Sequence, residues 1–228
     1  QSNDIKTLTQ KTAAELSKSP EDQTLKRFEI IALLKGGNFG EASQKALVLS
    51  EMSKKIPDYL LYAESRLKLG DYIGGVETLK KAYFLNFDET TAERIALIQY
   101  AQLGEKNEAI KFLKEHLGVH GNSQIIGKRL GSFYADSGQL NDAALMYEQT
   151  FEAFKETSAA DEALKIYLHQ QDIPKMTALL EKSGLNDPLL LDLYVKVKAF
   201  DKESSLAQTL YEREDNHLYL AQSAVFKY

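Results

Sequence analysis

Two histidines have the spacing most suggestive of chemistry in this sequence of 228 residues. His116 and His120 are four residues apart, and on a helix that spacing places two metal ligands on one face. However, Gly118 and Gly121 interrupt the stretch, and the carboxylate of a metalloprotease motif is missing. We therefore predict a polar loop between two helices at this point, and no metal site.

Other arrangements that could support catalysis or cofactor binding are equally incomplete. Residues 36–40 are rich in glycine and precede a helical pattern, where free N–H groups could hold an anion. They lack the Gly-Lys-Ser/Thr of a phosphate loop. Carboxylates such as Glu152 and Glu156 have the spacing of an exposed helix face. The absence of cysteine excludes disulfides, iron–sulfur centres and thiolate nucleophiles. We predict that the chain is not an enzyme and uses no cofactor.

The charge balance indicates which partners to expect. Lysine and arginine number 28 against 33 aspartates and glutamates, a net charge of −5, which argues against a dedicated nucleic-acid binder. The whole excess of negative charge lies in residues 148–228, which hold 14 acidic and nine basic residues. A solvated acidic surface would explain this excess, and the alternative is a second contact region for a basic partner.

The ends of the sequence bear on its origin. Residues 1–3 (Gln-Ser-Asn) are typical of what remains after a tag is cleaved, so we expect the natural protein to extend further. The trimmed start and the absence of cysteine favour the periplasm or cell envelope slightly over the cytoplasm, and the compartment stays open. No stretch approaches the ~18 apolar residues of a membrane span, so we expect none.

The elements that would carry these residues are helices. Apolar residues recur with the 3.6-residue period of a helix, as in Ile5, Leu8 and Leu16, and no segment alternates with the period of a strand. Glycines punctuate the helical patterns at a regular interval. Gly37, Gly70, Gly104 and Gly138 are separated by 33, 34 and 34 residues, which indicates a repeat.

Alignment on those glycines reveals a motif. The clearest copy has Leu130-Gly131, then Tyr134, Gly138, Ala143 and Tyr147. This pattern resembles the tetratricopeptide repeat (TPR) family, whose unit is a helix–turn–helix of 34 residues. The resemblance implies an all-α fold, a right-handed TPR-like α-solenoid of stacked antiparallel helix pairs with no sheet.

The resemblance also implies a layout for the chain. Residues 1–3 are a tag remnant, 4–22 a flanking helix, 23–216 about five repeats, and 217–228 a C-terminal helix or the start of a further repeat. The repeats run roughly over 23–56, 57–89, 90–123, 124–156 and 157–216, the last range holding degenerate units without the turn glycine. Small residues such as Ala109 and Ala143 are expected where helices approach closely, and Tyr100, Tyr134 and Tyr167 are expected in the core.

In the TPR family, the first helix of each pair lines a concave face on which peptides lie. The partner-binding candidates that this implies are Arg27, Lys35, Glu64, Lys68, Arg94, Gln102, Lys128, Ser132, Asp136 and Lys165. Some family members hold a carboxylate with a basic residue and an asparagine four positions later. Here those later positions are Ile31, Ile98 and Ser132, so a mixed groove for an acidic or amphipathic peptide fits better.

The expected function is a bacterial protein–protein interaction scaffold or adaptor that binds a peptide or a partner protein. Two alternatives remain. One is an assembly factor of the envelope, of secretion or of motility, resembling a lipoprotein, that holds another subunit. The other is a regulatory solenoid that senses a peptide or a small ligand.

Overall fold

The structure is a computed structural model that describes residues 7, 11–12, 14–185, 187–196 and 198–214. Every regular element in this part of the chain is a helix, with no strand among the described residues, so the all-α prediction is confirmed. The helices are α2 (Gln23–Lys35), α3 (Phe39–Ser53), α4 (Ile56–Lys68), α5 (Tyr72–Asn86), α6 (Glu89–Ala101), α7 (Lys106–His120), α8 (Gln124–Asp136), α9 (Leu140–Phe154), α10 (Thr157–Gln170), α11 (Ile173–Ser183), α12 (Asp187–Lys196) and α13 (Phe200–Glu214).

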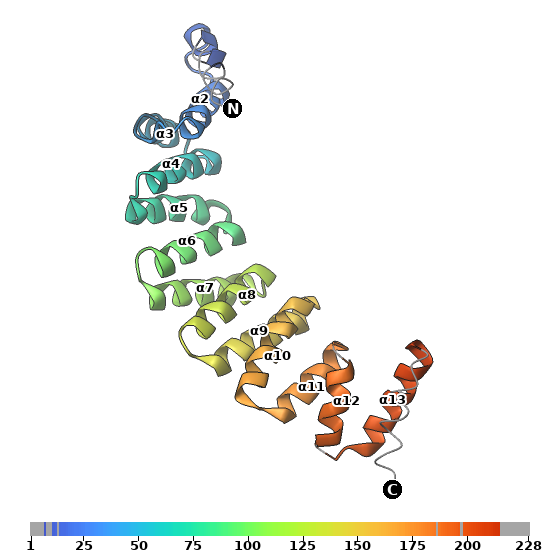
Figure 1. Ribbon diagram of the computed structural model, residues 1–228. Helices are drawn as coiled ribbons and strands as arrows, with labels where there is room; N and C mark the ends of the chain where they lie inside the picture. Colours follow the sequence, from blue (N-terminus) through green and yellow to red (C-terminus); the bar gives the residue numbers. More distant parts are fainter. Residues whose placement is uncertain (1–6, 8–10, 13, 186, 197, 215–228) are drawn as a thin grey trace. The chain divides into compact units, whose positions relative to one another are not determined.

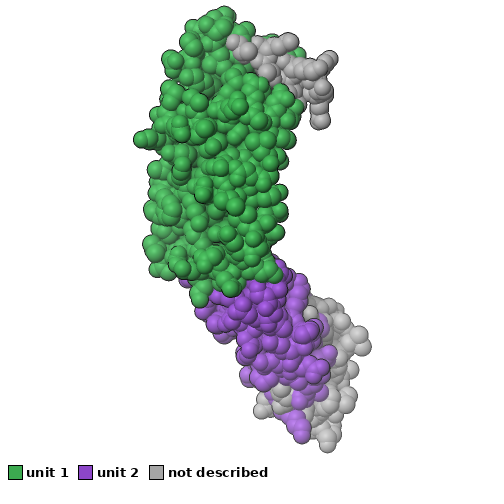
Figure 2. All heavy atoms as spheres, turned by 90° about the vertical axis from the view of Figure 1, so that its left-hand side faces the viewer, with its two compact units in different colours: residues 1–121 green, residues 122–228 purple. Residues whose placement is uncertain are grey.

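Antiparallel helix pairs stack on one another within two compact units. Unit 1 comprises residues 1–121 and unit 2 residues 122–228 (Figure 2). Unit 1 holds the pairs α2/α3, α4/α5 and α6/α7, and α3 contacts α4 as α5 contacts α6. Unit 2 holds α8/α9, α10/α11 and α12/α13, with α9 against α10 and α11 against α12. Figure 1 shows α4 to α7 running back and forth in alternating directions, the arrangement of an α-solenoid.

The periodic glycines form the turn inside each pair. Gly37, Gly70, Gly104 and Gly138 have φ between +71° and +80°, a region that glycine adopts without a steric penalty. The fifth pair has Gln171 at the same place, with φ of +56°. The turn geometry is therefore kept where the glycine is absent, at the cost of a conformation that residues with a Cβ rarely adopt.

Small residues lie where helices approach most closely. Ala109 and Ala143, for example, are fully buried. A Cβ placed on Gly131 in α8 would lie 2.6 Å from the ring of Tyr147 in α9, and one on Gly75 would lie 2.4 Å from Leu67. These two glycines are needed because a neighbouring side chain approaches the backbone closely. Neither has the positive φ of the turn glycines.

The repeated tyrosines belong to the core, as predicted. Tyr100, Tyr134 and Tyr167 occupy matching positions of α6, α8 and α10 and are all buried. Burial raises the pKa of Tyr167 above its usual value, and a hydrogen bond to Glu148 adds to the effect. The ring fills the space beside the small residues while the hydroxyl reaches a polar partner.

The prediction of a loop at the two closely spaced histidines is wrong. His116 and His120 lie in the last turns of α7, which continues through Gly118. One exposed glycine costs a helix only about 1 kcal/mol, and the packing of Leu113 and His116, both buried, outweighs that cost.

The segments that flank the repeats are only partly described. Residues 14–18 are helical, within the flanking helix expected at 4–22. Residues 1–3 and 217–228 lie outside the described residues. In the described part of the chain, no helix has the length and apolar character that a membrane crossing requires.

Candidate interaction surface

The first helices of unit 1 (α2, α4 and α6) carry five of the ten candidate residues, and a sixth directly follows α6. We call this surface the unit 1 face. Its candidates are Arg27, Lys35, Glu64, Lys68, Arg94 and Gln102.

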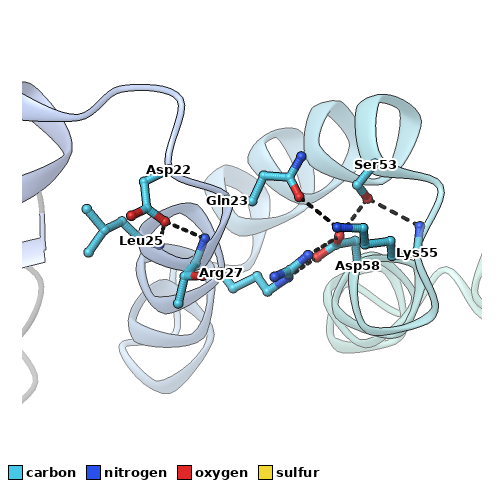
Figure 3. A network of polar contacts seen from close by, with 8 residues as sticks. Asp22, Gln23, Leu25, Arg27, Ser53, Lys55 and Asp58 are labelled. Atoms are coloured by element: carbon cyan, nitrogen blue, oxygen red, sulfur yellow. Dashed lines mark hydrogen bonds and ion pairs between the residues drawn. The ribbon is translucent and has the colours of Figure 1, made fainter.

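Arg27 is held by the next first helix. Its Nε donates to Oδ1 of Asp58 in α4 at 2.5 Å, and its Nη2 donates to Oδ2 at 2.7 Å (Figure 3). Ser53 Oγ donates to the same carboxylate at 2.5 Å. The Asp58 side chain is fully buried, whereas that of Arg27 keeps 23% of its surface exposed. The pair therefore joins the first helices of the first two helix pairs.

The electrostatics of Asp58 follow from these contacts. Burial by itself would raise the pKa of the carboxyl group, because it disfavours the charged form. Hydrogen bonds from Arg27 and Ser53, together with the charge of Arg27, outweigh burial and lower the pKa of Asp58. Asp58 is therefore ionised at neutral pH, and Arg27 is committed to neutralising it.

A second ion pair joins the next two first helices. Arg94 of α6 donates through Nη2 to Oε2 of Glu64 in α4. Lys68, four residues after Glu64, lies 3.7 Å from the other carboxylate oxygen. Side-chain exposures of 42% for Arg94 and 32% for Glu64 leave this pair open to solvent. A charged ligand can therefore replace one partner of the Arg94–Glu64 pair more easily than it can replace Asp58 in the Arg27–Asp58 pair.

The ends of the first helices carry the most accessible candidates. Lys35 and Lys68 are exposed at matching positions, and Lys35 has no ion pair among the described residues. Gln102 is the exposed C-cap residue of α6. Half-buried Leu34 and Leu67 each directly precede one of the lysines. The unit 1 face thus combines apolar side chains with exposed ammonium groups.

The unit 2 face holds the other four candidates on α8 and α10. Lys128 donates through Nζ to Ser158 Oγ at 2.7 Å and lies 3.8 Å from Glu156. Lys165 pairs with Glu162 one turn earlier at 2.6 Å. Ser132 is half-buried and Asp136 is exposed. The basic residues of this face are therefore already paired with acidic or hydroxyl groups.

Sequence reasoning missed Asp58, the acidic partner that decides the role of Arg27. A usable signal was present, because Arg27 and Asp58 are 31 residues apart and Glu64 and Arg94 are 30 apart. Opposite charges separated by slightly less than one repeat fall on neighbouring first helices.

A groove of about 450 Å³ lies at the start of unit 1, between the flanking segment and the first helix pair. Its lining includes Leu16 and Pro20 of the flanking segment, Ile30 of α2 and Leu49 of α3. Glu29 and Lys45 in its lining form an ion pair at 2.9 Å. The groove is of the size and apolar character that accept a side chain or a small ligand.

The described residues contain no group of three or more potential metal ligands. Among the candidates, Arg27, Glu64, Arg94 and Lys128 form ion pairs or hydrogen bonds between helices. The two faces can present charged and apolar groups to another molecule.

Comparisons with known proteins bear on the fold. No protein-family model matches the sequence, and no curated protein does. Solved structures do: a tetratricopeptide repeat protein from Parabacteroides merdae has a TM-score of 0.56 at 14% identity, with 99% of this chain and 88% of that chain covered. YrrB, described as a TPR protein with an unusual peptide-binding site, has a TM-score of 0.50 at 14% identity. The match covers 75% of this chain and 90% of YrrB.

A longer protein is also similar. A chain of the Naa15/Naa10 complex bound to HypK-THB has a TM-score of 0.50 at 15% identity and covers 94% of this chain, which spans only 35% of that one. At these identities the likeness concerns the fold alone. The chain has the fold of tetratricopeptide-repeat proteins, and the resemblance inferred from the glycine period is confirmed at that level.

Proposed function

We propose that this chain is a protein-interaction scaffold that binds a peptide or partner protein on the unit 1 face. The observation that carries the proposal is the combination at the ends of α2 and α4, where Lys35 and Lys68 are exposed beside half-buried Leu34 and Leu67. Ammonium groups beside apolar side chains suit a segment with acidic and apolar residues. The fold supports the proposal, since a solenoid offers an extended surface made of many helices.

The contacts divide the candidates into two roles. Arg27 neutralises buried Asp58, so we assign it to holding the helix pairs together and exclude it from direct binding. Arg94 and Glu64 form a solvent-open pair that a charged ligand can compete for. Gln102 extends the polar rim of the unit 1 face, and we propose the unit 2 face (Lys128, Ser132, Asp136 and Lys165) as a secondary contact region.

The test is a comparison of two doubly charge-reversed variants. Lys35→Glu with Lys68→Glu changes the unit 1 face. Lys81→Glu with Lys111→Glu makes the same charge change on α5 and α7, where both lysines are exposed and have no ion pair among the described residues. The variants are immobilised, native extract is passed over them, and the captured proteins are identified.

We expect a partner captured by the unchanged chain to be retained by the α5/α7 variant and lost by the unit 1 face variant. Equal thermal unfolding midpoints would show that both variants are folded. Loss of the partner from the α5/α7 variant alone would move the binding surface to the second helices and overturn the proposal. So would retention by both variants.

A further inference from the structure

A cluster of rings joins the second helices of two successive pairs in unit 1. We call it the α5–α7 joint, and it consists of Tyr83, Phe87, Phe112, His116 and His120. The ring of Tyr83 lies 5.2 Å from that of Phe112 and 5.8 Å from that of His116. Phe87 and His120 are 4.7 Å apart, and the two imidazoles are 4.8 Å apart. These contacts link α5 directly to α7.

His116 is the polar centre of the joint. Its side chain is 3% exposed, and its Nδ1 lies 2.8 Å from the hydroxyl oxygen of Tyr83, which is 4% exposed. Burial raises the pKa of Tyr83, so the phenol keeps its proton at neutral pH. With a neutral imidazole, the phenol donates its proton to an unprotonated Nδ1.

We propose that the α5–α7 joint is a pH-sensitive contact, in which neutral His116 holds the third helix pair of unit 1 against the second and protonation of His116 weakens that contact. The proposed function does not depend on this device.

The geometry explains the direction of the effect. A protonated Nδ1 must itself donate to the Tyr83 oxygen, which turns the phenol proton away from its acceptor inside a buried cluster. The imidazolium charge is also placed among aromatic rings, where its hydration is lost. Both consequences disfavour the protonated form of the folded chain.

The groups that face His116 act in opposite directions. His120 on the same helix opposes a second positive charge, whereas Glu89 of α6 and Asp88 in the preceding turn favour it. Asp88 is occupied with capping α6, since its carboxylate accepts hydrogen bonds from Thr90 and Thr91. Burial is the largest influence, and with His120 it lowers the pKa of His116 below its ordinary value.

The sign of the pH dependence follows. A histidine whose pKa is lowered by folding contributes stability that is complete above its unfolded pKa of about 6.5. That stability is lost as the pH falls below this value, because the unfolded chain then binds a proton that the folded chain resists. We therefore expect the joint to weaken between neutral and mildly acidic pH.

The experiment compares thermal unfolding of the whole chain at a series of pH values from 7.5 to 5.0. His116→Gln retains an acceptor for the Tyr83 hydroxyl and cannot be protonated in this range. His169→Gln removes an exposed histidine from α10 and serves as the matched control. We expect the midpoint of the unchanged chain and of the His169 variant to fall more steeply on acidification than that of the His116 variant.

A second measurement keeps the proposal testable if the His116 variant does not fold. In the unchanged chain, NMR of the imidazole protons should show His116 titrating below the usual histidine pKa of about 6.5. Parallel pH profiles for the three proteins, or a His116 titration at or above about pH 6.5, would overturn the proposal.

Discussion

Arg27 and Asp58 are bound to each other through two hydrogen bonds although they lie 31 residues apart in the sequence. One residue is on the first helix of the first pair and the other in the first turn of the first helix of the second pair. The Glu64–Arg94 pair repeats this relation between α4 and α6 with a separation of 30 residues. Charges on neighbouring first helices thus help to fix how successive pairs of unit 1 stack.

The two partners of the buried pair should not be equivalent on mutation. Arg27→Ala leaves a fully buried carboxylate without its cation, and we expect a loss of about 3 kcal/mol of unfolding free energy. Asp58→Ala should cost less, because the partly exposed guanidinium can turn to water. Urea unfolding measures both values. As a control, Lys182→Ala breaks an exposed pair with Glu152 and should cost well under about 1 kcal/mol. Equal costs for the Arg27 and Asp58 variants would contradict this account.

The same carboxylate should give the chain part of its acid sensitivity. Hydrogen bonds and the charge of Arg27 lower the folded pKa of Asp58 despite burial, which acts in the opposite direction. Its contribution to stability is therefore present above the unfolded pKa of about 3.9 and lost as the pH falls through the lower folded value. Urea midpoints between pH 5 and pH 3 should decrease more steeply for the unchanged chain than for Asp58→Asn. A parallel decrease in both would show that Asp58 does not contribute.

The backbone plan was predictable from the sequence because it depends on local chemistry. The turn glycines, the 3.6-residue period and the small residues at helix contacts each report a steric requirement that is visible in one repeat. Gly37 and Gly138 illustrate this, since both adopt the positive φ that their position in the pattern requires.

The side-chain pairing was not predictable in the same way. The place of Arg27 in the repeat predicts that it faces a ligand. Its actual partner is Asp58, which lies on another helix and is not visible from the repeat pattern around Arg27. His116 was expected in a loop because two glycines lie near it. Helix α7 forms regardless, because packing of His116 and its apolar neighbours in the core outweighs the local preference of Gly118.

Restoring the missing turn glycine should stabilise the fifth helix pair. Gln171 has φ of +56° at the position where four other pairs have glycine, and its side chain is exposed. Gln171→Gly removes the steric cost of that conformation and adds some entropy to the unfolded chain, so we expect a net gain of up to about 1 kcal/mol. Thermal unfolding measures the gain. The reverse change, Gly138→Gln, should destabilise by a similar amount, and a stabilising effect of that change would refute the steric argument.

Two helical glycines should respond in opposite directions to the same added methyl group. In Gly131→Ala the new Cβ would lie 2.6 Å from the ring of Tyr147, which cannot bend away, so we expect a loss of about 1–3 kcal/mol from overpacking. In Gly118→Ala the new Cβ meets no atom within 4 Å, and the exposed interior of α7 should gain about 0.5–1 kcal/mol from better helix propensity. Urea unfolding of both variants gives the sign of each change in stability directly.

A double variant tests the close packing of α8 and α9. If Gly131→Ala were stabilising, these helices would not pack as closely as described, and Tyr147→Leu in the Gly131→Ala background should then bring no recovery of stability. If they do pack that closely, the smaller side chain at position 147 should restore part of the loss.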